Sequence, residues 1–539
     1  MKKQAVATLL IASMLLTGCG AASTSTGASS TAASAVETKM TPGTYEGTAA
    51  GMRGDLTVAV TVDETSLLKV EVTNCVDTAV ISDAAIDTLP GQIVEEQNIQ
   101  VDNVSGATMT SLGIKNAVAN AIEIARNSDA KVVVLEKEAY TGGSSRVCGG
   151  GIWAVNSEIN KEIGQDSTLD EYIDFMKKNS GTDDLNTGLM SSIYNKSADV
   201  IEYYDNNGLP VSLETWSLGN PESQLPVLWA QKNDDTSWET GETGVFDAVE
   251  AIAEKLGVEI RLNSKVTELV QVDGAVSGVR VEDTDSTYQI NAKQVVLATG
   301  GFTRNRDLVE KLAPDYVNAF AFTGAGSTGD GITLTEDLDT VLVGDGMMGL
   351  SGLNMNTGYY GEEGNLVWLP QLKVNAEGKT FGMETAFYGD TLKLLLDQTG
   401  SCAYGIFDST TDVTDRLDKA VADGLAFKYD SLEELAADKG IDAAALAQTT
   451  AENNLADGPY YCIVIKPLFI GSIPGLKVDE NCRVLTSAGE PIEGLLACGE
   501  LVFGNVFNRA YPASGTGMAT SAYTGAIAGS TAVDALSAE

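Results

Sequence analysis

The chain has 539 residues, enough for more than one domain, and 75 acidic against 34 basic residues give it a formal net charge of -41. This charge excludes nucleic acid and an anionic membrane face as partners, because both would repel it, and it suits an exported protein that must stay soluble. The absence of histidine excludes C-x-x-C-H haem attachment, histidine-ligated metals and nucleophiles that need a histidine base.

The N-terminus has the layout of a secretory signal. Lys2 and Lys3 precede an apolar run over residues 5–16 that is too short to span a bilayer. Leu16-Thr-Gly-Cys19 follows and is typical of a bacterial lipobox, whose cysteine is diacylated. We therefore expect residues 1–19 to be a lipoprotein signal peptide, with the lipid on Cys19 anchoring the protein to the extracytoplasmic face of the cell membrane. The alternative is a cleaved signal with an incidental cysteine.

Residues 20–40, rich in serine, threonine and alanine, are predicted to be a tether. Residues 41–126 are predicted to form a small α+β domain. Residues 56–62 alternate like a half-buried strand, and residues 68–72 are its expected hairpin partner. An apolar stripe over residues 114–125 recurs at helical spacing.

One segment of this domain, Asp102-Asn-Val-Ser105-Gly-Ala-Thr108, has the pattern D-x-x-S-G-A-T and runs into the predicted helix. Its small residues allow a bulky nucleotide to approach the backbone. The helix that starts near Ser111 offers unpaired N–H groups and a positive dipole end to a phosphate. The alternative is an ordinary helix cap.

From residue 127 onward, short apolar strands alternate with glycine turns and helices, which predicts an α/β fold with a mostly parallel sheet. The expected strands are residues 131–136, 265–270, 276–281, 294–297 and 495–497, and the expected helices are residues 245–256, 514–529 and one that opens at 327–332. The seven cysteines lack metal-ligand spacing, so neither a zinc site nor an iron–sulfur cluster is predicted. Apart from Cys19, we expect them to be free thiols.

The set of motifs resembles two families. V-V-L-E-K, T-G-G-S-S, A-T-G-G-F, T-G-D-G, A-C-G-E and S-G-T-G, in this order, resemble the FAD-binding fumarate reductase/succinate dehydrogenase flavoproteins, which implies a Rossmann-like FAD-binding domain. The D-x-x-S-G-A-T segment resembles the flavinylation signal of FMN-binding domains, in which a flavin transferase esterifies FMN phosphate onto the last threonine, here Thr108. Together with the lipobox, the arrangement is similar to flavinylated extracellular reductases of anaerobes such as urocanate reductases.

The resemblance implies a role for each matching position. Glu136 would bind the adenosine ribose, Val266 the adenine, and Asp330 and Glu500 the ribityl chain. The last helix would direct its N-terminus at the flavin pyrimidine edge, where its dipole stabilises negative charge. The implied cofactor-binding residues are Ser105 and Thr108 for FMN, and Glu136, Gly142, Gly143, Ser144, Ser145, Gly149, Gly150, Val266, Ala298, Thr299, Gly300, Asp330, Glu500, Ser514, Thr516 and Gly517 for FAD. Tight turns between strands and helices are the alternative explanation of the glycines.

The resemblance also divides the chain. It implies that residues 127–345 and 466–539 form the FAD-binding domain and that residues 346–465 form an inserted α+β capping domain, which would close over the substrate. The first strand of the FAD-binding domain and its G-x-G-x-x-G loop are missing, because no glycine occurs between Gly113 and Gly142. Either the gene is truncated or mis-assembled, which we favour, or one helix is shared by both domains. The loss predicts weak FAD binding.

The substrate pocket departs from the family too. Arg509 matches the family's clamp arginine and is assigned to a substrate carboxylate, with a structural ion pair as the alternative. Tyr388 stands where the proton-donating arginine is expected and could supply a proton or be a core tyrosine. Since the clamp histidines are absent, fumarate is not the expected substrate. Tyr511-Pro-Ala-Ser-Gly515 resembles the turn of ketosteroid dehydrogenases in which tyrosine and glycine polarise a carbonyl.

These features predict a flavoprotein reductase. Electrons would pass from a quinol- or flavin-based donor at the membrane to covalent FMN, then to non-covalent FAD, and then as hydride to the C=C bond of an α,β-unsaturated acid or carbonyl compound. The predicted catalytic residues are Arg509, Tyr388, Tyr511 and Gly515. Two alternatives stay open, namely a dehydrogenase acting on a ring ketone and a tethered FMN carrier without enzymatic activity.

Overall fold

The computed structural model describes most of the chain from Met40 to Ser537. The residues outside this description are 1–39, 41, 100, 106, 108–109, 112–113, 116–130, 149–150, 156, 158–159, 161–166, 181, 207–210, 213–226, 231–243, 355–357, 359–360, 384–387, 510, 513–514 and 538–539. Cys19 and Thr108 are therefore not described, and neither is most of the helix predicted over 114–125. Among the described residues, no helix combines the length and the apolar character that crossing a membrane requires.

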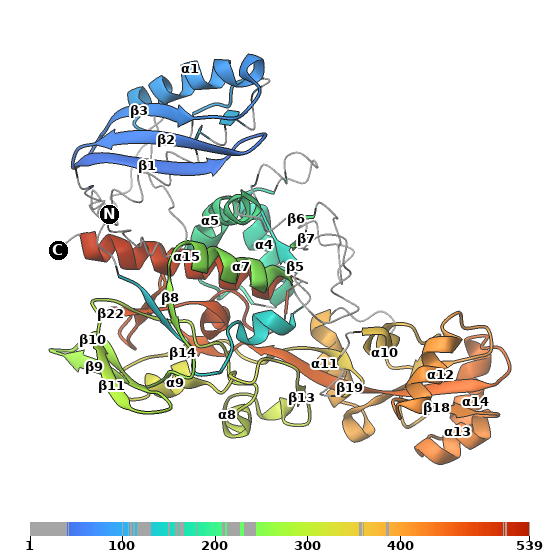
Figure 1. The fold of residues 1–539 in the computed structure, drawn as a ribbon. Coiled ribbons are helices and arrows are strands. Elements are labelled where there is room, and N and C mark those ends of the chain that lie inside the picture. The colour runs from blue at the N-terminus through green and yellow to red at the C-terminus, as the bar shows by residue number, and fades with distance from the viewer. Residues whose placement is uncertain are drawn as a thin grey trace, which may run out of the picture.

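In the described residues, the N-terminal part is a three-stranded antiparallel sheet with a helix packed against it (Figure 1). The strands are β1 (Gly43–Ala50), β2 (Asp55–Val62) and β3 (Leu67–Asn74), and the helix is α1 (Ala79–Glu96). Alternate residues of β2, from Leu56 to Val62, are buried and pack with Leu89 and Ile93 of α1, as the alternating pattern predicts. The predicted hairpin over β2 and β3 is confirmed. The sequence analysis missed α1.

The larger part contains the predicted parallel strands, but in two separate pairs. β4 (Val133–Leu135) pairs with β8 (Glu259–Arg261), and β12 (Val295–Leu297) pairs with β22 (Pro491–Ala497). Within the described part, β4 has no second neighbour and β12 has none either. These two pairs agree with the expected parallel strands, although they do not join into one sheet, and most strand pairs elsewhere in the described residues are antiparallel.

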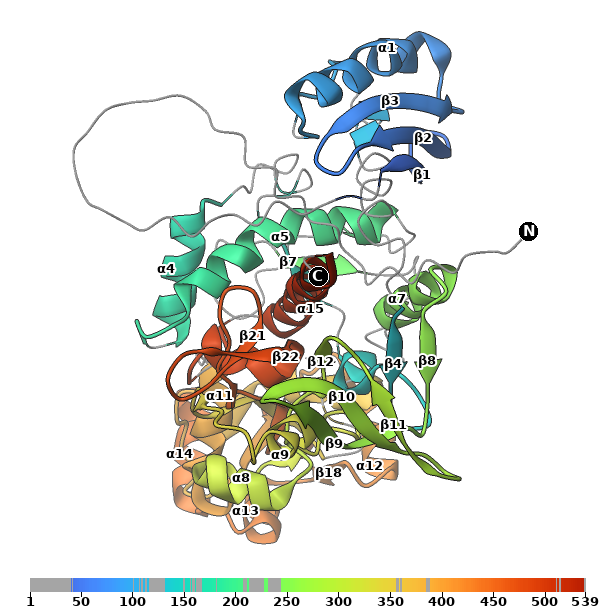
Figure 2. The ribbon, with the colours of Figure 1, turned by 90° about the vertical axis from the view of Figure 1, so that its left-hand side faces the viewer.

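Further helices and strands pack around β12 and β22 in the middle of the body, whereas β4 and β8 lie side by side at its right-hand edge in Figure 2. Helix α15 (Thr516–Ser537) packs against α5 (Thr187–Asn206), β12 and β22, and Tyr523 of α15 donates a hydrogen bond to the carbonyl oxygen of Trp153. The predicted helix near 245–256 and the predicted hairpin over 265–281 are confirmed. The elements not yet named here are η1 (Gly143–Val147), β5 (Gly151–Trp153), α4 (Leu169–Ser180), β6 (Val211–Ser212), β7 (Val227–Ala230), α7 (Gly244–Lys255), β9 (Lys265–Val272), β10 (Ala275–Glu282), β11 (Thr287–Asn291), α8 (Arg306–Leu312), η2 (Pro314–Tyr316), α9 (Asp330–Leu334), β14 (Leu342–Val343), β20 (Gly475–Leu476), β21 (Arg483–Leu485) and η5 (Gly499–Asn505).

The region predicted to be a cap carries two small cores of its own, around Phe407 and around Ile406. Strand β19 (Tyr460–Ser472) is shared with the rest of the molecule: its first half pairs with β17 (Ala403–Phe407) and β18 (Ala426–Tyr429), and its second half pairs with β15 (Met347–Gly352). Figure 1 shows β19 running from the lobe of α12, α13 and α14 into the body. The other elements here are β13 (Phe320–Ala321), α10 (Gly361–Gly364), η3 (Asn365–Trp368), β16 (Leu372–Val374), α11 (Tyr388–Leu396), η4 (Thr399–Ser401), α12 (Thr414–Ala422), α13 (Leu432–Lys439) and α14 (Ala443–Glu452).

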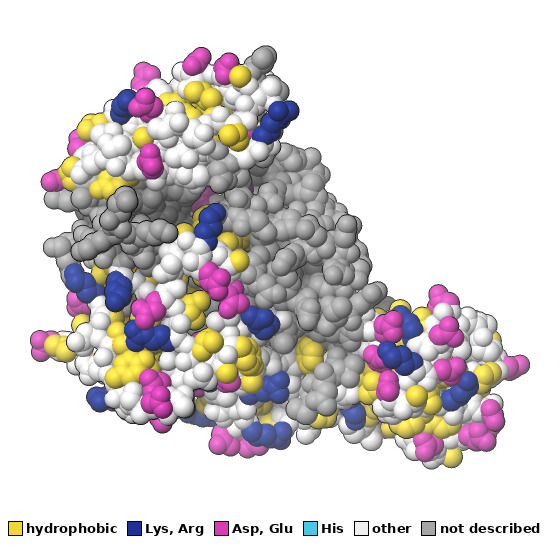
Figure 3. Space-filling view, in the orientation of Figure 1, with side chains coloured by type: hydrophobic (Ala, Val, Ile, Leu, Met, Phe, Trp, Pro, Cys, Tyr) yellow, Lys and Arg dark blue, Asp and Glu magenta, His cyan; other side chains and the backbone are white. Residues whose placement is uncertain are grey.

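The surface reflects the composition. On the face drawn in Figure 3, acidic side chains are spread over the N-terminal domain, the body and the lobe, and lysine and arginine side chains are dispersed among them. The described residues visible on that face form no concentrated basic area of the kind that a polyanion requires.

Candidate functional site

Two glycine-rich segments far apart in sequence meet after β4. Gly142 and Gly143 adopt positive φ angles of 102° and 47°, which glycine tolerates without strain. A Cβ atom at Gly324 would overlap with the backbone of Gly143. The Ser144 hydroxyl accepts a hydrogen bond from Gly324 N at 3.2 Å and lies 3.1 Å from Ser327 Oγ. The predicted phosphate-lining loop therefore lies directly against the segment that leads into T-G-D-G.

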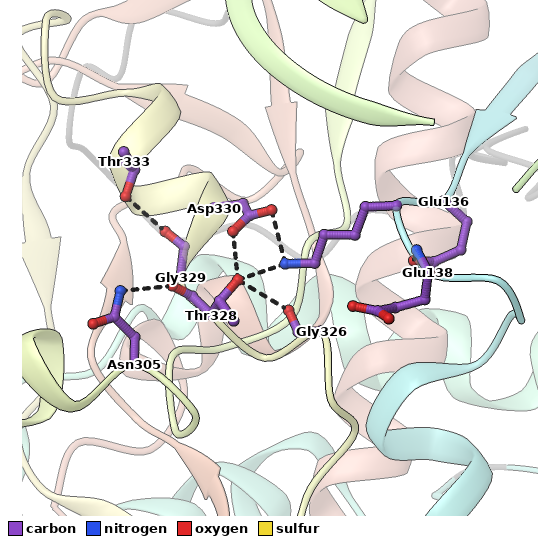
Figure 4. A network of polar contacts seen from close by, with 9 residues as sticks. Glu136, Glu138, Asn305, Gly326, Thr328, Gly329, Asp330 and Thr333 are labelled. Atoms are coloured by element: carbon purple, nitrogen blue, oxygen red, sulfur yellow. Dashed lines mark hydrogen bonds and ion pairs between the residues drawn. The ribbon is translucent and has the colours of Figure 1, made fainter. Parts of the chain in front are cut away.

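An ion pair joins the same two regions. Lys137 Nζ lies 2.9 Å from Asp330 Oδ2, with about a fifth of each side chain exposed. Thr328 donates a hydrogen bond from its hydroxyl to Asp330 Oδ1 at 2.6 Å (Figure 4). Asp330 was expected here from the family resemblance, whereas roles for Lys137 and Thr328 were not predicted. The available signal was their position, since each stands within two residues of an assigned acid.

Glu136 lies at the C-terminal end of β4, as a ribose-binding acid should. Its Oε1 accepts a hydrogen bond from the backbone N–H of Glu138 at 2.8 Å. Burial raises the pKa of the Glu136 carboxyl above its ordinary value, more than its hydrogen bonds lower it. Val266, the expected adenine contact, is half-buried on β9 and packs against the main core.

The turn after β12 approaches Glu500. A Cβ atom at Gly301 would overlap with the Glu500 carboxylate, and one at Gly331 would overlap with the Thr299 hydroxyl. Glu500 Oε1 accepts hydrogen bonds from the Ser472 backbone N–H at 2.6 Å and from the Ser472 hydroxyl at 2.8 Å. Burial raises the pKa of Glu500. This carboxyl is thus rigidly held between two loops and the end of β19.

The Thr299 hydroxyl provides a test of whether a polar ligand fits here. Thr299 Oγ1 is buried and has no hydrogen-bond partner among the described residues, although buried polar groups are normally paired. Ala298, before it, is exposed, and Gly300, after it, has a φ angle of 69°. An unpaired hydroxyl among glycines that bring backbone close together fits a bound dinucleotide. The structure thus brings together Glu136, the 142–145 loop, the 298–301 turn, Asp330 and Glu500.

The N-terminus of α15, where the resemblance expects the flavin pyrimidine edge, is also buried. Thr516 is fully buried, and Gly517 lies beside Met348 and Phe503. The backbone N–H of Gly517 donates to the Tyr511 hydroxyl at 3.5 Å, and Gly515 has a φ angle of 83°. Tyr511 is itself buried. The tyrosine hydroxyl therefore lies at the positive end of the helix, where a carbonyl oxygen would also be stabilised.

The remaining predicted residues are less constrained. Arg509 has an exposed side chain, and its Nε lies 3.8 Å from Asp345 Oδ2. Tyr388 is the first residue of α11, but its side chain is not described. Ser105 is exposed at the surface of the N-terminal domain. Thr108, Gly149, Gly150 and Ser514 lie outside the described residues.

Comparisons with known proteins agree with this arrangement. The profile of the FAD-binding domain family matches residues 117–518, and that of the FMN-binding domain matches residues 51–123. A fumarate reductase (cytochrome) of Shewanella frigidimarina is 26% identical over 416 residues, which cover 70% of this chain and 69% of that protein. A urocanate reductase of Eggerthella lenta is 25% identical over 542 residues, which cover 85% of this chain and 87% of that protein.

The fold has solved counterparts. The open conformation of a flavocytochrome c3 fumarate reductase superposes with a TM-score of 0.61 at 23% identity, covering 75% of this chain and 74% of that chain. This likeness confirms the mixed α/β fold, and the family match over residues 117–518 confirms the expected FAD-binding domain.

Proposed function

This chain belongs to the FAD-binding domain family and carries an FMN-binding domain ahead of it. We propose that it reduces the C=C bond of an α,β-unsaturated acid or carbonyl compound, on the extracytoplasmic face of the cell membrane. It is an FAD- and FMN-dependent oxidoreductase that acts on CH–CH groups. The observation that carries the proposal is the close approach of Gly301 to the Glu500 carboxylate, together with the hydrogen bond from the Gly517 N–H at the start of α15 to the Tyr511 hydroxyl.

The flavin, when bound, supplies the two-electron chemistry, and the chain's residues bind and polarise the substrate. Arg509 would hold a substrate carboxylate through its two-pronged guanidinium. Tyr511 and the Gly515 N–H would hold a carbonyl oxygen at the start of α15. Tyr388, or a neighbouring acid, would deliver the proton to the α-carbon.

The electron supply completes the proposal. A membrane-side donor, quinol- or flavin-based, would feed the FMN-binding domain, to which a flavin transferase would attach FMN at Thr108. The lipid on Cys19 would keep the protein beside that donor on the extracytoplasmic face. The order of the chain supports this electron path, because the FMN-binding match lies between the predicted tether and the match to the FAD-binding family.

The absent G-x-G-x-x-G loop is part of the proposal. We propose that the chain lacks the first strand of the dinucleotide fold and therefore holds the FAD pyrophosphate weakly. The separate β4–β8 and β12–β22 pairs support this, since the missing strand normally lies between their counterparts. We also propose the division into an FAD-binding domain over 127–345 and 466–539 and a cap over 346–465.

The test is a turnover assay on full-length, flavin-loaded protein with a reduced dye as electron donor. Unsaturated acids, enones and saturated ring ketones would be screened separately. Oxidation of the dye by unsaturated acids or enones is expected. Reduction of an oxidised dye by ring ketones alone would instead indicate the dehydrogenase alternative, which the buried Tyr511 at the start of α15 favours. No turnover in either direction would contradict the proposal.

A further inference from the structure

Three described hydroxyl groups, one inside the predicted flavin attachment segment (residues 102–108) and two just after it, differ sharply in exposure. Ser105 is exposed, whereas Thr110 is 1% and Ser111 is 0% exposed. Ser111 Oγ donates to the carbonyl oxygen of Ala107 at 2.8 Å and accepts from the backbone N–H of Val104 at 3.1 Å. The Ser111 hydroxyl is therefore buried and engaged with the backbone of Val104 and Ala107, so it is not available to a transferase.

Thr110 is fixed by a residue from another part of the domain. Its hydroxyl donates a hydrogen bond to Asp77 Oδ2 at 2.7 Å across 33 positions of sequence. The other carboxylate oxygen, Asp77 Oδ1, accepts from the backbone N–H of Arg53 at 2.7 Å, in the turn between β1 and β2. A Cβ atom at Gly51 would overlap with this carboxylate. The Asp77 carboxylate, which is half-buried, thus connects the β1–β2 turn to Thr110, just after the attachment segment.

The charge state of Asp77 fits this role. Burial acts to raise its pKa, but the hydrogen bonds from Thr110, Met52 and Arg53 outweigh burial and lower it. The carboxylate is therefore ionised at neutral pH and accepts from both sides at once. Hydrogen bonds to a charged acceptor are stronger than neutral ones.

We propose that Asp77 is the positioning residue for flavin attachment: its hydrogen bond to the hydroxyl of Thr110, two positions after Thr108, is required for efficient modification of Thr108. The inference rests on the proposed attachment of FMN at Thr108. In that transfer the bond between Thr108 Oγ and phosphorus forms, the pyrophosphate bond of a flavin dinucleotide donor breaks, and the nucleoside monophosphate leaves. The hydroxyl proton passes to solvent, and no group is oxidised or reduced.

The experiment measures attachment, not turnover. Full-length protein is incubated with a flavin transferase and FAD at limiting transferase, and the FMN adduct is followed by intact mass. Asp77→Ala and Thr110→Val, which is isosteric but has no hydroxyl, are expected to slow attachment about tenfold, in line with the loss of a hydrogen bond to a charged group. Thr110→Ser retains the donor and is expected to react at close to the wild-type rate.

A matched control separates positioning from general destabilisation. Val60→Ala removes volume from the buried core of the same domain without touching Asp77 or Thr110. It is expected to lower the melting temperature while leaving the attachment rate unchanged. The inference is overturned if Asp77→Ala reacts at the wild-type rate, or if Val60→Ala slows attachment as much as Asp77→Ala does. Wild-type protein that gains no adduct would contradict the proposed attachment itself.

Discussion

At the scale of residues, the site depends on a few charged groups held between loops. Lys137 and Asp330 form the clearest example, because their ion pair joins the end of β4 to the start of α9 and is mostly shielded from water. The ion pair could not be predicted from the sequence, because 193 positions separate its two members. The family resemblance implied a role for Asp330, but only the fold brings Lys137 to it.

Replacing Lys137 tests whether this pair supports the dinucleotide site. Lys137→Met leaves the Asp330 carboxylate partly buried without its cation, which costs about 1–3 kcal/mol. We expect FAD affinity, measured by quenching of flavin fluorescence, to fall about tenfold in Lys137→Met. The matched control is the double variant Lys137→Met/Asp330→Asn, which should recover part of the loss. Equal affinity in all three proteins would contradict a role for the pair.

Glu500 gives a prediction with a defined sign. Burial raises the pKa of its carboxyl in the fold above the ordinary 4.5. Between that value and the raised pKa, the unfolded chain binds fewer protons than the fold, so this group makes stability decrease as pH rises. Glu500→Gln removes the titration but keeps an acceptor for Ser472. Melting curves of both apoproteins across about pH 4 to 7 should show that the stability of the variant increases relative to that of the wild type as pH rises. A constant difference would disprove the account of this carboxyl.

Arg509 is the predicted carboxylate clamp. Its exposed pair with Asp345, at 3.8 Å, contributes little to stability, so its side chain can turn to a substrate. Arg509→Lys keeps the charge but loses the planar fork, and we expect KM for an unsaturated acid to rise about tenfold. Arg306→Lys on α8, which pairs with Glu310 at the surface, should leave KM unchanged. An unaltered KM in Arg509→Lys would remove this residue from the site.

At the scale of elements, local patterns predicted what depends on local order. The β2–β3 and β9–β10 hairpins followed from alternation and short turns, and the strands that end in glycine followed from their apolar runs. Helix α1 was missed because its apolar residues are weakly segregated and Pro90 lies inside it. The pairing of β19 with four strands that precede it, β13, β15, β17 and β18, depends on contacts between distant segments, which periodicity does not contain.

The state of β4 can be tested by hydrogen exchange. In the described part, β4 pairs on one side only, and Val134 is 41% exposed. Amides in such a strand open with little free energy. A peptide covering Val133–Leu135 should exchange much faster than one from the middle of β19, which has neighbours on both sides. Comparable protection of the two peptides would mean that the sheet around β4 is complete.

At the scale of the whole molecule, the hydrophobic cores divide the protein. The core between residues 40 and 114 shares no residue with the main core or with those of the lobe. Separate cores favour separate unfolding. Calorimetry should therefore resolve more than one thermal transition. Leu89→Ala, at a fully buried position of the first core, should lower the melting temperature of one transition, because it reduces the free energy of unfolding of that core by about 2–5 kcal/mol. Leu495→Ala in the main core should lower the melting temperature of another transition. Joint movement of all transitions in either variant would contradict this division.

The central claim is that one polypeptide carries two flavins, one attached and one released on denaturation. The most direct measurement is the flavin content of full-length protein produced with a flavin transferase and then precipitated with acid. We expect FMN to stay with the pellet, as an added mass on the peptide that contains Thr108, and FAD to appear in the supernatant. A colourless pellet with an unmodified Thr108 would contradict the account, and a supernatant without FAD would leave a protein that only carries electrons.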